Sequence, residues 1–143
     1  MDNFTKMNIK ILQILHKKEL FAIIVKKNNQ FKKSGVNFVT KDTNPLQLGF
    51  LKHKKGHTIK SHLHIKKVRK VKFLSECLMI KKGKIKVSFY DDKKRNIKKD
   101  QILNKDDLIM LFRGGHGFKV IQDVEIIEVK QGPYTKSKDK ILI

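Results

Sequence analysis

The feature that most restricts the fold is the regular alternation of apolar and polar side chains between Lys84 and Tyr90. Ile85, Val87 and Phe89 occupy every second position, with polar residues between them. A period of two is that of a β-strand with one buried face, whereas an amphipathic helix repeats every 3.6 residues. The segment therefore predicts a strand, and hardly any of the remaining chain has helical periodicity.

Other apolar runs between turn-forming residues also favour strands. The run from Val71 to Ile80 is expected to end at the turn Lys81-Lys82-Gly83. A continuously apolar stretch, Leu108 to Phe112, is typical of a strand that is covered on both faces. Further strands are predicted at 20–26, 36–40, 46–52, 97–103, 118–121 and 124–129. So many short strands predict an all-β domain, closed as a barrel or a sandwich.

The length of 143 residues predicts one domain with a sizeable core. A lone cysteine, Cys77, cannot form an intramolecular disulfide, and a reducing cytoplasm is the expected location. Charged residues interrupt the N-terminal apolar runs, so no stretch reaches the roughly 18 residues of a membrane span. No signal peptide is predicted either, because an uninterrupted apolar region before a cleavage site is missing.

A net charge of +21 is the most pronounced feature of the composition. It arises from 34 basic and 13 acidic residues and should attract anions in general, including nucleic acid, acidic lipids and phosphorylated metabolites. Nearly all the basic residues are lysines, however, whereas base and phosphate recognition favours arginine. No nucleic-acid-binding motif is present, so nucleic acid is not the predicted partner.

Four side chains are candidate metal ligands. His62 and His64 are two residues apart, so on a strand they would project to the same side. Glu76 lies among apolar neighbours, where an uncompensated carboxylate would be costly, and His116 lies in the glycine-rich stretch Gly114–Gly117. Three imidazoles and one carboxylate suit a divalent transition metal such as Fe, Mn, Zn or Ni. The alternative is that each is an ordinary surface or turn residue.

The order Gly56, His62-x-His64, Glu76, Gly83 resembles the first characteristic motif of the cupin superfamily. The stretch from Asp106 to His116 is similar to the second cupin motif. The intervals differ, because eleven residues separate His64 from Glu76 and Phe112 stands where that motif usually carries a proline. The resemblance implies a double-stranded β-helix, or jelly-roll barrel. It implies a single domain over 1–143, with the cupin core at about 46–134 and an N-terminal strand extension at 1–45.

The resemblance is closest to single-domain cupins encoded among surface-polysaccharide and nucleotide-sugar genes. It implies one divalent metal held by His62, His64, Glu76 and His116, and a small polar substrate such as a sugar or nucleotide-sugar. Isomerase or epimerase chemistry is then expected, with oxygen chemistry at ferrous iron as a variant. A non-catalytic, metal-stabilised binding or regulatory module is the alternative, and a basic RNA-associated protein is the third.

The charge also predicts that the ligand is anionic and passes Lys60, Lys66 and Arg113 as it enters the barrel. For Arg113, a surface ion pair with Asp106 or Asp107 is an equally good interpretation. Open strand edges near the N-terminus and at 141–143 predict a symmetric homodimer.

Overall fold

In the computed structural model of the protein, residues 10–27, 33–134 and 140–143 are described. These residues form strands, turns and loops, and none of them is helical, which confirms the predicted all-β class. The eight strands are β1 (Ile11–His16), β2 (Glu19–Val25), β3 (Gly35–Phe38), β4 (Gly49–Lys52), β5 (Glu76–Tyr90), β6 (Gln101–Asn104), β7 (Leu108–Leu111) and β8 (Gly115–Lys130). Parts of the N-terminal strand extension predicted at 1–45 fall outside the described residues.

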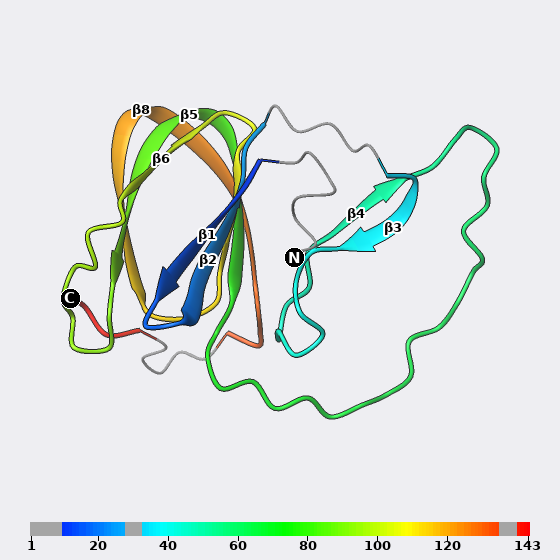
Figure 1. The fold of residues 1–143 in the computed structure, drawn as a ribbon, viewed down its shortest axis with the longest axis horizontal. Coiled ribbons are helices and arrows are strands. Elements are labelled where there is room, and N and C mark those ends of the chain that lie inside the picture. Colours follow the sequence, from blue (N-terminus) through cyan, green and yellow to red (C-terminus); the bar gives the residue numbers. More distant parts are fainter. Residues whose placement is uncertain (1–9, 28–32, 135–139) are drawn as a thin grey trace.

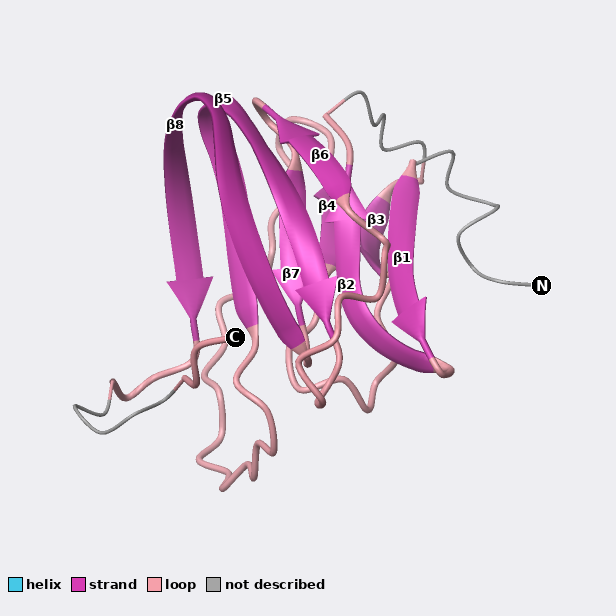
Figure 2. Cartoon of the chain, turned by 90° about the vertical axis from the view of Figure 1, so that its left-hand side faces the viewer, coloured by secondary structure: helices cyan, strands magenta, loops and turns pink. Residues whose placement is uncertain are grey.

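Six of the strands form one antiparallel sheet in the order β1-β2-β7-β5-β6, with β8 paired to β5. The first half of β5 lies between β7 and β8, and its second half lies between β6 and β8. The two longest strands, β5 and β8, bend strongly along their length, so the sheet curls into a half-barrel (Figure 1; Figure 2). The hairpin of β3 and β4 is a separate two-stranded sheet.

The main core fills the concave side of the half-barrel. Ile85, Val87 and Phe89 are almost completely buried there, as their alternation predicts. Strand β7 contributes to both faces, because Ile109 packs into this core while Met110 packs against the opposite side of the sheet. The prediction that this strand is covered on both faces is therefore confirmed.

A buried ion pair joins the N-terminal strands to the turn before β7. Asp107 is only 2% exposed, and its carboxylate accepts a hydrogen bond from Lys26 Nζ at 2.9 Å. The backbone N–H groups of Lys27 and Asn104 donate to the same carboxylate. Since β2 also pairs with β7, the strand predicted at 20–26 belongs to the main sheet.

The predicted turn at Lys81-Lys82-Gly83 does not end a strand. Strand β5 continues through it to Tyr90, and the pairing with β8 shifts register between Ile80 and Ile85. Gly83 has a φ of +80°, which fits a bulge in a continuous ladder as well as a turn between two strands. The runs predicted at 118–121 and 124–129 likewise merge into the single strand β8.

The largest difference from the sequence prediction is at residues 53–75, called here the basic loop. No strand is present there, although His62 and His64 were expected on one. Its aliphatic residues are separated by lysines at irregular intervals, so no face of a strand could be buried in a regular way.

The part of the chain that the structure describes contains no helix with the length and apolar character of a membrane span.

Candidate functional site

The structure brings two of the four predicted ligands together. Glu76 begins β5 and lies opposite Leu111 of β7, whereas His116 follows the turn after β7 and lies opposite Phe89. Residues directly opposite each other share a face of the sheet, and both partners belong to the core of the concave side. Glu76 Oε2 and His116 Nε2 are 3.3 Å apart on that side.

This carboxylate and imidazole are part-buried, with exposed side-chain fractions of 17% for Glu76 and 28% for His116. The hydrogen bond from His116 lowers the pKa of Glu76, and this effect outweighs the opposing effect of desolvation. The positive charges of Lys130 and Lys140 lower it further. The carboxylate is therefore ionised at neutral pH and available as an acceptor or a ligand.

Two glycines allow the chain to deliver His116 to this position. Gly114 has a φ of +72°, and a side chain there would meet the ring of Phe21 at 2.2 Å. At Gly115, a Cβ atom would lie 2.4 Å from the side chain of Ile143. Gly114 is thus the position in this stretch that requires a glycine, because its positive φ and the closeness of Phe21 both disfavour a side chain.

His62 and His64 lie apart from this pair, in the exposed basic loop. Their rings contact each other at 5.2 Å between centroids, and His62 Nδ1 is 3.0 Å from the carbonyl of Lys60. Within the described part of the chain, no three His, Cys, Asp or Glu side chains lie close enough together to hold a metal ion. The metal site therefore stays a prediction, with Glu76 and His116 in contact and the two loop histidines apart from them.

Arg113 lies at the same end of the sheet, two residues beyond the end of β7. Its guanidinium forms ion pairs with Glu19 and with Asp92, the latter at 3.1 Å, so the predicted pairing with Asp106 or Asp107 is wrong. It also stacks on Phe73, with 4.8 Å between the guanidinium carbon and the ring centroid. The contact joins the end of the basic loop to the end of the half-barrel.

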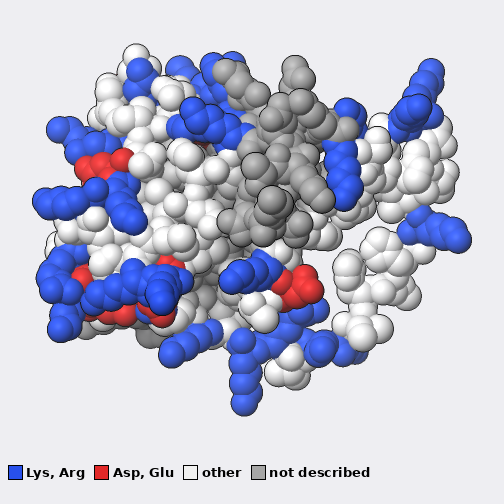
Figure 3. Space-filling model, in the orientation of Figure 1, with Lys and Arg blue, Asp and Glu red and all other residues white. Residues whose placement is uncertain are grey.

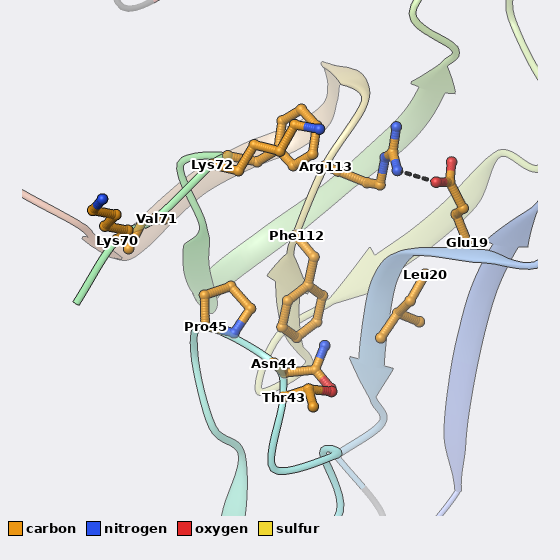
Figure 4. Close-up of a pocket in the computed structure, with 11 residues that line it drawn as sticks. Glu19, Leu20, Thr43, Asn44, Pro45, Lys70, Val71, Lys72, Phe112 and Arg113 are labelled. Carbon is orange, nitrogen blue, oxygen red and sulfur yellow. Dashed lines mark ion pairs between the residues drawn. The ribbon is translucent and has the colours of Figure 1, made fainter.

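Arg113 also lines a pocket of about 450 Å³ (Figure 4). Apolar side chains such as Leu20 and Phe112 form part of its wall, and Lys72 and Arg113 contribute positive charge. No pattern in the sequence pointed to this pocket, because its residues come from segments far apart in the chain: Glu19, Leu20, 43–45, 70–73, Phe112 and Arg113. The predicted entry residues Lys60 and Lys66 do not line it and are exposed in the basic loop.

The only cysteine lies on the other face of the sheet from Glu76. Cys77 is half-buried and packs against the cluster that contains Met110 and Phe112. Burial raises the pKa of its thiol, so the group is protonated at neutral pH. The thiol is a packing group and no part of the Glu76–His116 pair.

In comparisons with known proteins, the chain matches no family model, no curated protein and no solved structure. The residues themselves therefore carry the functional argument.

Proposed function

We propose that this protein is a cupin-like metalloprotein that binds one divalent transition metal on the concave side of its half-barrel. The observation that carries the proposal is the contact of Glu76 with His116. These residues come from distant parts of the sequence, and they meet on one face in the order that the cupin resemblance requires. In this proposal the half-barrel is part of a double-stranded β-helix.

The donor set suits such an ion in its chemistry. Glu76 offers an ionised carboxylate, and His116 offers an imidazole held beside it. His62 and His64 complete the set when the basic loop folds over the concave side. A bound ion would supply Lewis-acid polarisation of a substrate carbonyl or hydroxyl.

The chain's own residues define the rest of the proposal. The contact of Arg113 with Phe73 fastens the end of the basic loop close to the turn that carries His116. The excess of lysines attracts an anionic ligand, with Lys60, Lys66 and Arg113 as the candidate contacts. We propose a sugar or nucleotide-sugar as the substrate and an isomerisation or epimerisation as the reaction.

Elemental analysis after exposure to Zn²⁺, Mn²⁺, Fe²⁺ or Ni²⁺, followed by gel filtration, tests the metal site. We expect about one ion per chain, and a loss of that ion in the double variant His62→Ala/His64→Ala. The matched control is His53→Ala/His57→Ala, which removes two exposed imidazoles from the same loop. Glu76→Gln should also weaken binding.

Three other outcomes of the metal-binding experiment would lead to different conclusions. Equal losses in the two histidine pairs would show that loop imidazoles bind metal without a defined site. Full retention in all variants would place the metal elsewhere and overturn the proposal. Metal that binds and stabilises the protein, without turnover of any sugar or nucleotide-sugar in a panel, would favour a non-catalytic binding module.

A further inference from the structure

The basic loop is richer in basic residues than the rest of the chain. Between Asp42 and Glu76 the sequence contains no acidic residue. Its basic residues are Lys54, Lys55, Lys60, Lys66, Lys67, Arg69, Lys70 and Lys72. Figure 3 shows the same separation on one face of the molecule, where the part of the loop on the right carries Lys and Arg but no Asp or Glu.

Large aliphatic side chains project from this loop into solvent. Leu63 is 95% exposed, Val68 is 90% exposed and Ile65 is 85% exposed, values that only the C-terminal Ile141 and Leu142 match or approach among the exposed aliphatic residues of the described chain. The loop swings away from the half-barrel and returns to β5 only at its end (Figure 1). A group of exposed aliphatic side chains of this kind marks an interaction surface.

Aliphatic side chains among unopposed cations fit an anionic lipid surface better than other anionic partners. Lysines gain energy beside acidic headgroups, and aliphatic side chains gain energy in the acyl boundary. Single-stranded nucleic acid would instead need aromatic side chains for stacking, and the projecting residues are aliphatic.

We propose that the basic loop docks the protein on anionic membrane surfaces, with Leu63, Ile65 and Val68 inserted at the headgroup boundary and the surrounding lysines on the headgroups. This inference does not rest on the metal site. The two uses of the loop are compatible, because in an extended segment Leu63 and Ile65 face away from His62 and His64. Imidazoles turned toward the sheet therefore leave Leu63 and Ile65 outward, and Val68 lies four residues beyond His64.

Vesicle flotation with the full chain tests the proposal. We expect binding to vesicles of 30% phosphatidylglycerol in phosphatidylcholine, none to pure phosphatidylcholine, and at least a tenfold loss between roughly 50 and 500 mM NaCl. The triple variant Leu63→Ser/Ile65→Ser/Val68→Ser keeps every charge and should bind at least tenfold more weakly. The variant His62→Ala/His64→Ala should bind as the unaltered protein does, which separates this test from that of the metal.

Two variants with equal changes in net charge test whether the basic loop is the part of the protein that binds the vesicle. Lys66→Glu/Lys67→Glu should lose at least tenfold in affinity, whereas Lys93→Glu/Lys105→Glu changes the net charge equally at exposed positions outside the loop. That control should lose much less. Equal losses would show that only the total charge matters and would overturn the assignment to the loop.

Insertion can be observed directly, because the chain has no tryptophan. In Leu63→Trp, the sole indole should shift its emission to the blue on anionic vesicles and be quenched by brominated lipid. Leu142→Trp places an equally exposed reporter near the C-terminus, where no shift is expected. No shift in either variant, or the absence of vesicle binding, would overturn the proposal. Binding to single-stranded RNA but not to vesicles would reassign the loop to nucleic acid.

Discussion

At the scale of single residues, Asp91 shows how one carboxylate fixes a turn. It closes the loop after β5, where its Oδ1 accepts hydrogen bonds from the backbone N–H groups of Lys93 and Arg95. Its Oδ2 accepts two more from the Arg95 guanidinium, at 2.9 and 2.7 Å. These contacts, with Arg95 first among them, lower the pKa of Asp91 from 3.8 to about 2.

This shift predicts a pH-dependent contribution to stability. A carboxylate whose pKa is lower in the folded state stabilises the fold above its unfolded pKa, and the contribution fades as the pH falls toward the folded value. The difference in urea midpoint between the unaltered protein and Asp91→Asn should therefore be full at pH 5–7 and shrink between pH 3.8 and about 2. The variant Asp42→Asn, at an exposed position, serves as the control. A difference in urea midpoint for Asp91→Asn that does not change with pH would contradict a lowered pKa of Asp91.

Asp107 has a different role, since it holds a buried charge. Replacement by Ala would leave two backbone N–H groups without this acceptor and would break the ion pair with Lys26, whose Nζ also donates to the carbonyl oxygen of Ile102 at 2.6 Å. Loss of one partner of such a network should cost roughly 3 kcal/mol of unfolding free energy, measured by urea denaturation. The neighbour Asp106 is exposed and has a φ of 68°, which Asn tolerates, so Asp106→Asn should change stability by less than about 0.5 kcal/mol. Similar costs at both positions would contradict this account.

At the scale of elements, Gly83 is where β5 and β8 change register. A Cβ atom at this position would lie 1.9 Å from the backbone oxygen of Asp123, in addition to the strain of a φ of +80°. Gly56 has a similar φ of +85° with nothing within 4 Å, so it isolates the strain alone. Gly56→Ala should cost about 1 kcal/mol, and Gly83→Ala at least about 2 kcal/mol more. Equal costs in thermal or urea unfolding would show that the strands separate easily at this bulge.

The elements that the sequence predicted well are those with a regular period or a continuous apolar run. Strands β5 and β7 bury the residues that their patterns mark for burial. Boundaries were less predictable: the run expected at 97–103 forms only β6. The irregular spacing of the aliphatic residues in the basic loop argues against a strand there, but the exposure of these residues depends on the absence of a neighbouring strand, which no local pattern encodes.

The candidate site was also predictable only in part. The contact between Glu76 and His116 follows from the pairing of β5 with β7 and β8, and it was the resemblance to the cupin motifs that grouped these two residues. The partners of Arg113 were not predictable, because Glu19 begins β2 and Asp92 lies in the loop after β5, both far from Arg113 in the sequence. Acidic residues are scarce in this chain, so local spacing favoured Asp106 and Asp107 wrongly.

At the scale of the whole molecule, the half-barrel has three strands that are paired along one edge only. Among the described residues, β1 pairs only with β2, and β6 and β8 each pair only with β5. The second predicted edge, at 141–143, is not a strand, although its aliphatic side chains are exposed. Open edges favour association with a second copy, and the charge of +21 opposes it.

These opposing effects predict a homodimer whose population depends on salt. Screening shortens the range of the repulsion between two +21 chains to about 8 Å at 0.15 M ionic strength, while hydrogen bonds between strand edges are little affected. Light scattering at micromolar concentration should therefore show more dimer at roughly 300 mM than at 20 mM NaCl. Ile127→Lys adds a charge to the half-exposed surface of β8 and should reduce the dimer, whereas Val36→Lys makes an equal change on the separate β3–β4 hairpin and should not. A monomer at both salt concentrations would rule out the homodimer, and an equal effect of both lysines would show that association does not use β8.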